Sequence, residues 1–445
     1  MTGGIRSDAG LPARAIAPAG RGSVHRNAPG PPGVPVETIL AVAGALSAAY
    51  VLVSAVNPAR HLRQLDIDVY LMGARHLLDG RLYLTGLAQS PHLPFTYPPF
   101  AALVFTPLAL LPTGPAQVLW SVVNVLALFA LVRLSIRAVR PGIDGREVTL
   151  WSFVLMAPAY AMEPVSLTFS FGQVNLVLAA LVLWDLTGDV RLGRSSGRPV
   201  PRGVLVGVAA AVKLTPLVFI PYLFVTGRAR AAWTAVVSFS LCSAVAAVFD
   251  PRVSWAYWTR YATDARRIGA AYYISNQSLQ AAADRLDHRV VPAGPVDAVA
   301  LVVLVAGVAL AAWAYRASSD LLGILVCAAT GLLVSPVTWA HHMVWIVPVL
   351  VWLAWAPDRP RSGRAAAAAG AVLFWWAPIW TVPSGADREL SEHGVQLALG
   401  NAFFLATVLF LAGTTVLMVS RGRHDRFRAV VPRGTVPVFT DRDDP

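Results

Sequence analysis

The feature that most limits how this chain can fold is a series of long apolar stretches joined by short polar connections. About 20 apolar residues in a helix are enough to cross the hydrocarbon core of a bilayer. Of the 445 residues, 56% are hydrophobic and 13% are charged, well below the roughly 25% charged residues of soluble domains. The pattern therefore predicts an all-α polytopic membrane protein. Its candidate spans are 37–57, 98–112, 116–136, 149–168, 173–188, 204–225, 230–249, 297–316, 320–336, 342–357, 365–382 and 398–420.

The net charge of +12 comes from arginines that cluster beside these stretches. Basic connections next to membrane spans mark the cytoplasmic side. The sequence has no basic patch on a soluble domain, so it does not indicate nucleic-acid binding. We expect residues 1–36 to be a disordered cytoplasmic tail and 421–445 a second cytoplasmic tail. The long connections 58–97 and 250–296 then lie outside the cell.

Two arginine-rich connections, 137–147 and 189–203, are both expected in the cytoplasm. This requires 98–112 to be re-entrant or interfacial, and 204–225 to break into a hairpin. Prolines in both stretches permit such breaks. We therefore expect about ten to thirteen transmembrane helices.

The first outer connection contains the segment LDIDVY, with Asp66 and Asp68. The stretch VYLMGARHLLDG predicts a short helix ending near Gly80, with Asp68 as its N-cap. Asp66 precedes that cap and is free to face a cleft. A DxD pair alternatively suggests a divalent metal on a sugar diphosphate, although the motif alone is weak.

The segment SPVTWAHHMVWIVP places His341 and His342 at the outer end of a span. A neutral histidine can act as a base, and a protonated one can bind phosphate. The competing interpretation is a pair of interfacial histidines beside the aromatic belt of Trp339 and Trp345. Two adjacent histidines at the same face as Asp66 favour a functional role.

The second outer connection contains YATDARRIGAAYYISNQSLQ. Arg267 and its neighbour Arg266 can clamp a phosphate, and Asn276 and Gln277 can bond sugar hydroxyls. A solvated amphipathic loop with snorkelling arginines explains the same residues equally well.

Polar residues inside apolar stretches are costly unless paired, so they are functional candidates. Gln173 and Asn175 follow Glu163 in EPVSLTFSFGQVNL, and Lys213 is the only lysine of the chain. Interhelical hydrogen bonds are the alternative for the amides. For Lys213, snorkelling to the cytoplasmic headgroups is at least as good an explanation.

Taken together, the segments LDIDVY, PFTYPPFAA, FGQVNL, VKLTP, SNQS and SPVTWAHHMVW occur in an order that resembles actinobacterial GT-C glycosyltransferases. The closest similarity is to the polyprenol-phosphate-mannose-dependent α-(1→2)-mannosyltransferases, over roughly residues 37–420. These enzymes elaborate phosphatidylinositol mannosides, lipomannan and lipoarabinomannan. The resemblance implies a GT-C-type fold with catalytic loops on the extracytoplasmic face of the cell membrane.

The resemblance also implies the chemistry, an inverting transfer of mannose from polyprenol-phosphate mannose to an α-mannoside. The family's base matches Asp66, and its paired histidines match His341 and His342. Asp68 matches a position where histidine also occurs, which weakens a two-acid metal site. We expect no metal and no cofactor, because basic side chains can stabilise a departing monophosphate. The residues expected to contact substrate are Asp68, Tyr97, Gln173, Asn175, Lys213, Arg267, Asn276 and Gln277.

Two other functions remain open at this stage. One is arabinofuranosyl transfer from a polyprenol-phosphate arabinose on the same architecture. The other is a non-enzymatic transporter of lipid-linked sugars, which predicts inverted repeats with paired broken helices near the midplane. No clear inverted repeat is visible, and the polar residues gather at one face. The partners expected for the enzyme are membrane lipids, the lipid-linked donor and a mannosylated lipoglycan acceptor.

Overall fold

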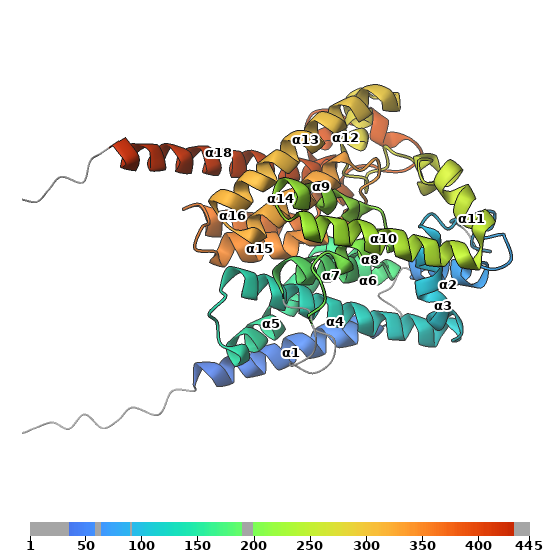
Figure 1. Cartoon of the computed structure of the whole chain (residues 1–445), viewed down its shortest axis with the longest axis horizontal. Helices are drawn as coiled ribbons and strands as arrows, with labels where there is room; N and C mark the ends of the chain where they lie inside the picture. The colour runs from blue at the N-terminus through green and yellow to red at the C-terminus, as the bar shows by residue number, and fades with distance from the viewer. Residues whose placement is uncertain (1–34, 58–63, 90, 189–198, 431–445) are drawn as a thin grey trace, which may run out of the picture.

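The protein is a bundle of helices in the computed structural model, which describes residues 35–57, 64–89, 91–188 and 199–430 (Figure 1). Within these ranges there is no β-strand, and the extended pairing consists of isolated bridges such as Asn276 with Trp339. The predicted all-α class is confirmed. Nearly all of the predicted tail 1–36 and the last part of the tail 421–445 lie outside the described residues.

The helices have the following bounds. They are α1 (Val36–Val56), α2 (Leu65–Arg75), α3 (Pro99–Ala109), α4 (Thr113–Val139), α5 (Gly145–Tyr160), α6 (Glu163–Phe171), α7 (Asn175–Thr187), α8 (Val204–Val212), η2 (Thr215–Val218), α9 (Phe219–Val225), α10 (Ala229–Phe249), α11 (Pro251–Ala256), η3 (Tyr257–Tyr261), η4 (Ala265–Ile268), α12 (Leu279–Leu286), α13 (Ala293–Ala317), α14 (Asp320–Val334), η5 (Ala340–Trp345), α15 (Ile346–Trp355), α16 (Gly363–Trp376), η6 (Pro378–Thr381), η7 (Arg388–Ser391), α17 (Val395–Gly400) and α18 (Ala402–Val430).

Five of the described helices are long and apolar enough to cross a membrane, and six if one bent pair counts as a single span. The five are α1, α4, α10, α13 and the first 21 residues of α18. The other apolar stretches form shorter or broken helices. Full-length spans are therefore fewer than the ten to thirteen that the sequence predicted.

The first stretch that was expected not to cross, 98–112, forms the 11-residue helix α3. Figure 1 shows α2 and α3 together at one end of the molecule, while α1 and α4 run back to the other end. The connection between α4 and α5 consequently lies at the same end as the start of α1. This arrangement brings the arginine-rich connection 137–147 to the end where α1 begins, as predicted.

Two helix breaks shape the centre of the bundle. The stretch 204–225 breaks at Lys213 and Leu214, between α8 and η2, in the region where a break was predicted. A second break was not predicted: α5 and α6 meet at an angle of 81° at Ala161 and Met162. Pro158 precedes this bend inside α5, and Pro164 opens α6. The bend ends the long helix early, so that the loop after α6 lies inside the bundle.

Helix α2 begins earlier than predicted, and this changes the roles of both acids. Gln64, in a left-handed conformation with φ 45°, is its N-cap, so Asp66 and Asp68 both lie in the first turn. The prediction that Asp68 caps the helix and that Asp66 precedes the cap is wrong. The helix also ends at Arg75, before Gly80. Carboxylates in a first turn are favourable there because they face the positive end of the helix dipole.

Candidate functional site

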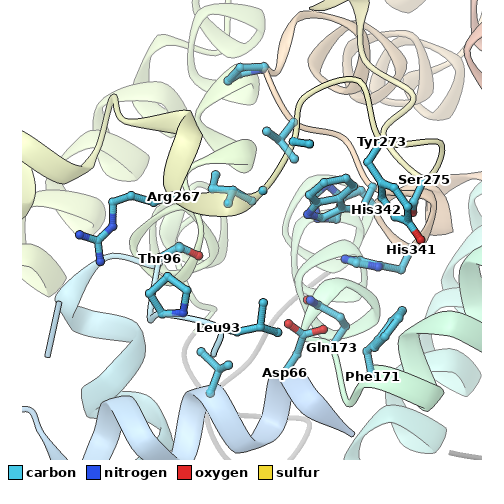
Figure 2. Close-up of a pocket in the computed structure, with 18 of the residues that line it drawn as sticks. Asp66, Leu93, Thr96, Phe171, Gln173, Arg267, Tyr273, Ser275, His341 and His342 are labelled. Carbon is cyan, nitrogen blue, oxygen red and sulfur yellow. The ribbon is translucent and has the colours of Figure 1, made fainter. Parts of the chain in front are cut away.

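A cavity of about 660 Å³ opens at the end of the bundle that carries α2, and it collects most of the predicted site residues (Figure 2). Its walls come from the start of α2, the loop before α3, the break after α6, the break at Lys213, the connection 257–275, the segment 335–342 and the loop before η7. The candidate residues that line it are Asp66, Tyr97, Gln173, Lys213, Arg267, His341 and His342.

Asp66 is held by Gln173, whose side chain makes a hydrogen bond to its carboxylate. The amide oxygen of Gln173 accepts from the hydroxyls of Tyr70 at 2.9 Å and Tyr97 at 3.3 Å. The Tyr70 hydroxyl also lies 3.0 Å from that of Tyr97. With its oxygen used by two tyrosines, Gln173 presents its NH₂ group to Asp66, as Figure 2 shows. This network fixes the direction of the carboxylate.

The environment of Asp66 favours its protonated form. Burial raises the pKa of the carboxyl group to about 6, against the opposing effects of the Gln173 hydrogen bond and the Lys213 charge. A carboxylate with this pKa is ionised at neutral pH and basic enough to accept a proton. That combination suits a general base.

Gln173 reaches Asp66 because of the glycine before it. Gly172 ends α6 with φ 69°, a conformation that L side chains rarely adopt. A Cβ atom there would lie 2.9 Å from the Cγ2 atom of Ile67. Only glycine allows the turn after α6 to pack directly against the first turn of α2.

Lys213 lies in the cavity wall, where its ammonium group has partners within the protein. Its ammonium group donates to the Oδ1 atom of Asn175 at 2.8 Å and lies 2.9 Å from the Nε2 atom of His342. It also lies 5.5 Å from the ring centre of Tyr97. The snorkelling interpretation is wrong, because these partners hold the charge inside the protein. A protonated Lys213 requires His342 to accept at Nε2 and to carry its proton on Nδ1.

The two histidines differ in their partners. Both ring nitrogens of His341 are buried and have no hydrogen-bond partner, although the ring lines the cavity. The ring packs edge-on against Phe171, with centroids 5.6 Å apart. The backbone oxygen of His341 accepts from Asn175 at 3.0 Å. Asn175 thus positions both Lys213 and His341, and the free imidazole is available to a ligand.

Asp68 points away from the cavity. Its Oδ1 atom accepts from the Gln117 side chain of α4 at 3.0 Å, and the residue does not line the cavity. Two residues apart on a helix, the two acids face different directions. They do not form a common metal site in this structure, and Asp68 is better placed to anchor α2 on α4 than to bind substrate.

Arg267 lines the same cavity on its opposite side from the histidines (Figure 2). Its guanidinium lies 4.2 Å from the ring centre of Tyr261 and donates to the backbone oxygen of Tyr83 at 2.8 Å. One of its nitrogens, Nε, is buried without a hydrogen-bond partner. Arg267 was predicted to clamp a phosphate, and this role stays a prediction for a residue in the cavity wall.

Asn276 and Gln277 are fully buried and serve the protein itself. The Oδ1 atom of Asn276 accepts from the backbone of Thr338 at 2.7 Å, and Gln277 donates to the backbone of Gly400 at 2.7 Å. Neither residue lines the cavity. Their amides join the second outer connection to its neighbours, and they are not part of the substrate site proposed below.

Sequence reasoning missed Arg285, which holds the connection that contains Tyr272 and Tyr273. Arg285 is fully buried and donates to the backbone oxygens of Tyr272 and Asn276, at 3.1 and 2.9 Å, and to Asn401 Oδ1 at 2.7 Å. In the sequence it stands among alanines and acids, which is typical of a solvated helix. Only its partners, distant in sequence, reveal its role.

A membrane bundle with broken helices, and a cavity at one end that holds an acid, a lysine and two histidines, defines a class of membrane enzyme. Residues 95–336 match the model of glycosyltransferase family 87. Together with the relatives described next, this match shows that the chain belongs to glycosyltransferase family 87, and it is an all-α polytopic membrane enzyme.

Three similar proteins are named as mannosyltransferases. A polyprenol-phosphate-mannose-dependent alpha-(1-2)-phosphatidylinositol mannoside mannosyltransferase of Mycobacterium tuberculosis is 35% identical, over 84% of this chain and 90% of the relative. Two phosphatidylinositol pentamannoside mannosyltransferases with the same donor dependence are also similar. The one from M. tuberculosis is 35% identical over 83% of each chain, and the one from Mycolicibacterium smegmatis is 37% identical over 70% of this chain and 72% of its own. No solved structure matches this chain.

Proposed function

We propose that this protein transfers mannose from polyprenol-phosphate mannose to an α-mannoside and forms an α-1,2 linkage. The observation that carries the proposal is the placement of Asp66, Lys213 and His341 around one cavity. An inverting transfer needs a base for the acceptor hydroxyl and positive charge for the departing phosphate. The cavity supplies both kinds of group, and the similar proteins are named for this donor and linkage.

Asp66 acts as the base in this proposal. The acceptor oxygen attacks C1 of the donor mannose, and its proton moves to the Asp66 carboxylate. The bond between C1 and the phosphate oxygen breaks as the new bond forms on the opposite face of the sugar, so a β-linked donor gives an α product. Gln173 holds the carboxylate in place for this step.

Lys213 and the histidine pair face the departing polyprenyl phosphate. Lys213 carries the positive charge, and His341 offers two ring nitrogens that have no partner within the protein. A monophosphate carries less charge than a nucleotide diphosphate, so these groups suffice without a metal or another cofactor. Asn175 holds Lys213 and the histidine segment in their positions relative to each other through its two hydrogen bonds.

The reaction takes place at the extracytoplasmic side of the cell membrane. Arg146, at the start of α5, lies 3.2 Å from Glu37 in the first turn of α1, whereas α2 and α11 lie at the other end of the bundle (Figure 1). Basic residues accumulate on the cytoplasmic side of membrane proteins. This distribution supports an outward-facing cavity.

The acceptor belongs to the mannosylated lipids of the cell envelope. The names of the similar proteins favour a phosphatidylinositol mannoside, and the α-mannosides of lipomannan and lipoarabinomannan have the same terminal chemistry. Membrane lipids and this lipoglycan are the partners that the proposal requires.

The test is transfer by the purified protein in lipid nanodiscs. Polyprenol-phosphate mannose and a short α-mannoside are supplied with EDTA, and GDP-mannose serves as control donor. We expect a new α-1,2-linked mannose from the lipid donor alone, with no effect of EDTA. Product only from a polyprenol-phosphate arabinose would replace this proposal by arabinosyl transfer, and a requirement for a divalent metal would refute the metal-free mechanism.

A further inference from the structure

The cavity carries opposite charges on two of its walls. Lys213 and the histidines form the basic wall beside Asp66, as described above. Two further acids line the same cavity, Asp387 in the loop before η7 and Glu389 in η7 itself. The proposed chemistry does not use these two carboxylates.

Glu389 is buried, and only one of its two carboxylate oxygens has a hydrogen-bond partner. Only 1% of the residue is exposed, and its Oε1 atom accepts from the backbone of Gly385 at 2.7 Å. Its Oε2 atom is buried and has no hydrogen-bond partner. The charge of the nearby Arg285 offsets that of the carboxylate, but the unpartnered oxygen of this cavity-lining residue can still accept a hydrogen bond from a ligand.

Asp387 stands beside Glu389 in a strained backbone. Gly385, Ala386 and Asp387 are left-handed in succession, with φ 81°, 53° and 64°. The Oδ1 atom of Asp387 accepts from the Tyr272 hydroxyl at 2.5 Å. This bond joins the loop before η7 to the second outer connection, where Arg285 holds the backbone of Tyr272.

Aromatic rings line the same cavity as the acids. Trp339 packs edge-on against Tyr273, with centroids 6.0 Å apart, and both line the cavity. Trp380 also lines it, and its indole nitrogen donates to Glu163 at 2.6 Å. Trp339 precedes His341 by two residues, so these rings continue directly into the basic wall. Glu163, a candidate without a role so far, positions Trp380.

Carboxylates among aromatic rings suit a neutral sugar. The carboxylates accept hydrogen bonds from hydroxyls, while the rings cover the apolar faces of the pyranose. The same acids repel phosphate, which leaves the phosphate to the basic wall. We infer that Glu389 and Asp387, with Trp339, Tyr272 and Trp380, form the subsite for the terminal sugar of the acceptor. This inference rests on the proposed function because it identifies the bound sugar as that of the acceptor. Its binding test does not require transfer.

The test is direct binding to the protein in lipid nanodiscs, measured by titration calorimetry with an α-linked mannobiose. Glu389→Gln keeps the shape of the side chain and an oxygen for Gly385. We expect it to weaken mannobiose binding by about tenfold, the usual effect of losing a charged hydrogen-bond acceptor. Asp387→Asn, at an exposed position, gives a second variant with little risk to folding. The matched control is Asp68→Asn, an acid that does not line the cavity and whose asparagine keeps an oxygen for Gln117, and its mannobiose binding stays unchanged.

Inorganic phosphate is the second probe. Its binding is expected to be independent of Glu389 and Asp387 and to be lost in Lys213→Met. Unchanged mannobiose binding in both acid variants, or no mannobiose binding by the wild type, would overturn the subsite. Glu389-dependent mannobiose binding by a protein that transfers no mannose would sustain the sugar subsite and refute the proposed function.

Discussion

At the residue scale, Asp66 predicts how activity depends on pH. Its pKa is raised to about 6 by burial, and the base must be ionised to accept a proton. The ionised fraction falls as the pH drops below this value, so kcat/KM falls by about tenfold per pH unit below pH 6. A pH profile with a lipid-linked donor measures this, and a profile that is flat down to pH 4.5 would contradict the assignment.

The neighbouring acid provides the matched comparison. We expect Asp66→Asn to lose about 10²- to 10⁴-fold in kcat, the usual contribution of a general base. Asp68→Asn retains most activity, because asparagine keeps an oxygen for Gln117 and the side chain lies outside the cavity. Equal losses in the two variants would show that the acids act as a pair.

We expect replacement of Lys213 to reduce the rate of transfer, and we expect arginine at this position not to restore it. Lys213→Met removes the charge opposite Asp66 and leaves Asn175 and His342 without their shared partner, so we expect kcat to fall by about 10²-fold or more. Lys213→Arg retains the charge, but its planar fork does not replace the compact ammonium between these two side chains. The measurement is single-turnover transfer at saturating donor, and full activity of the arginine variant would refute this geometry.

At the element scale, the turn after α6 packs against the first turn of α2 and so positions Gln173 beside Asp66. Gly172→Ala places a side chain in a left-handed conformation and against Ile67. We expect a cost of about 1–2 kcal/mol in stability and a lower kcat, because α2 and Gln173 move apart. Melting in nanodiscs and transfer rates measure both effects. Gly114→Ala, at an open position in the first turn of α4, is the control and leaves both unchanged.

The elements also show what the sequence did and did not predict. A polar side chain in an apolar stretch stands out, so Gln173, Asn175 and Lys213 were found without a structure. The start of α2 was misplaced because Gln64, with no capping side chain, begins the helix in an unusual left-handed conformation. Arg285 and Glu389 were missed because charged residues in outer connections are usually solvated, and their burial depends on chain segments more than 100 residues away.

At the scale of the whole molecule, the distribution of arginines predicts topology. Ser362 is the exposed N-cap of α16, and Ser391 is the exposed last residue of η7, whose Glu389 lines the cavity. In intact cells, a membrane-impermeant maleimide is expected to label Ser391→Cys and to spare Ser362→Cys until the membrane is opened. The wild type, with Cys242 and Cys327, gives the background. Labelling of Ser362→Cys alone would invert the topology.

The order of the helices also separates the roles of different parts of the chain. Asp66, Gln173, Lys213 and the histidines lie at or before residue 342, whereas Asp387 and Glu389 follow more than 40 residues later. The acids of the sugar subsite and the charged groups of the reaction would thus be encoded in different stretches of the gene, while the subsite rings of Tyr272 and Trp339 lie among the latter. Changes in a few codons after residue 380 could then alter which acceptor is extended, while the residues that carry out transfer remain the same.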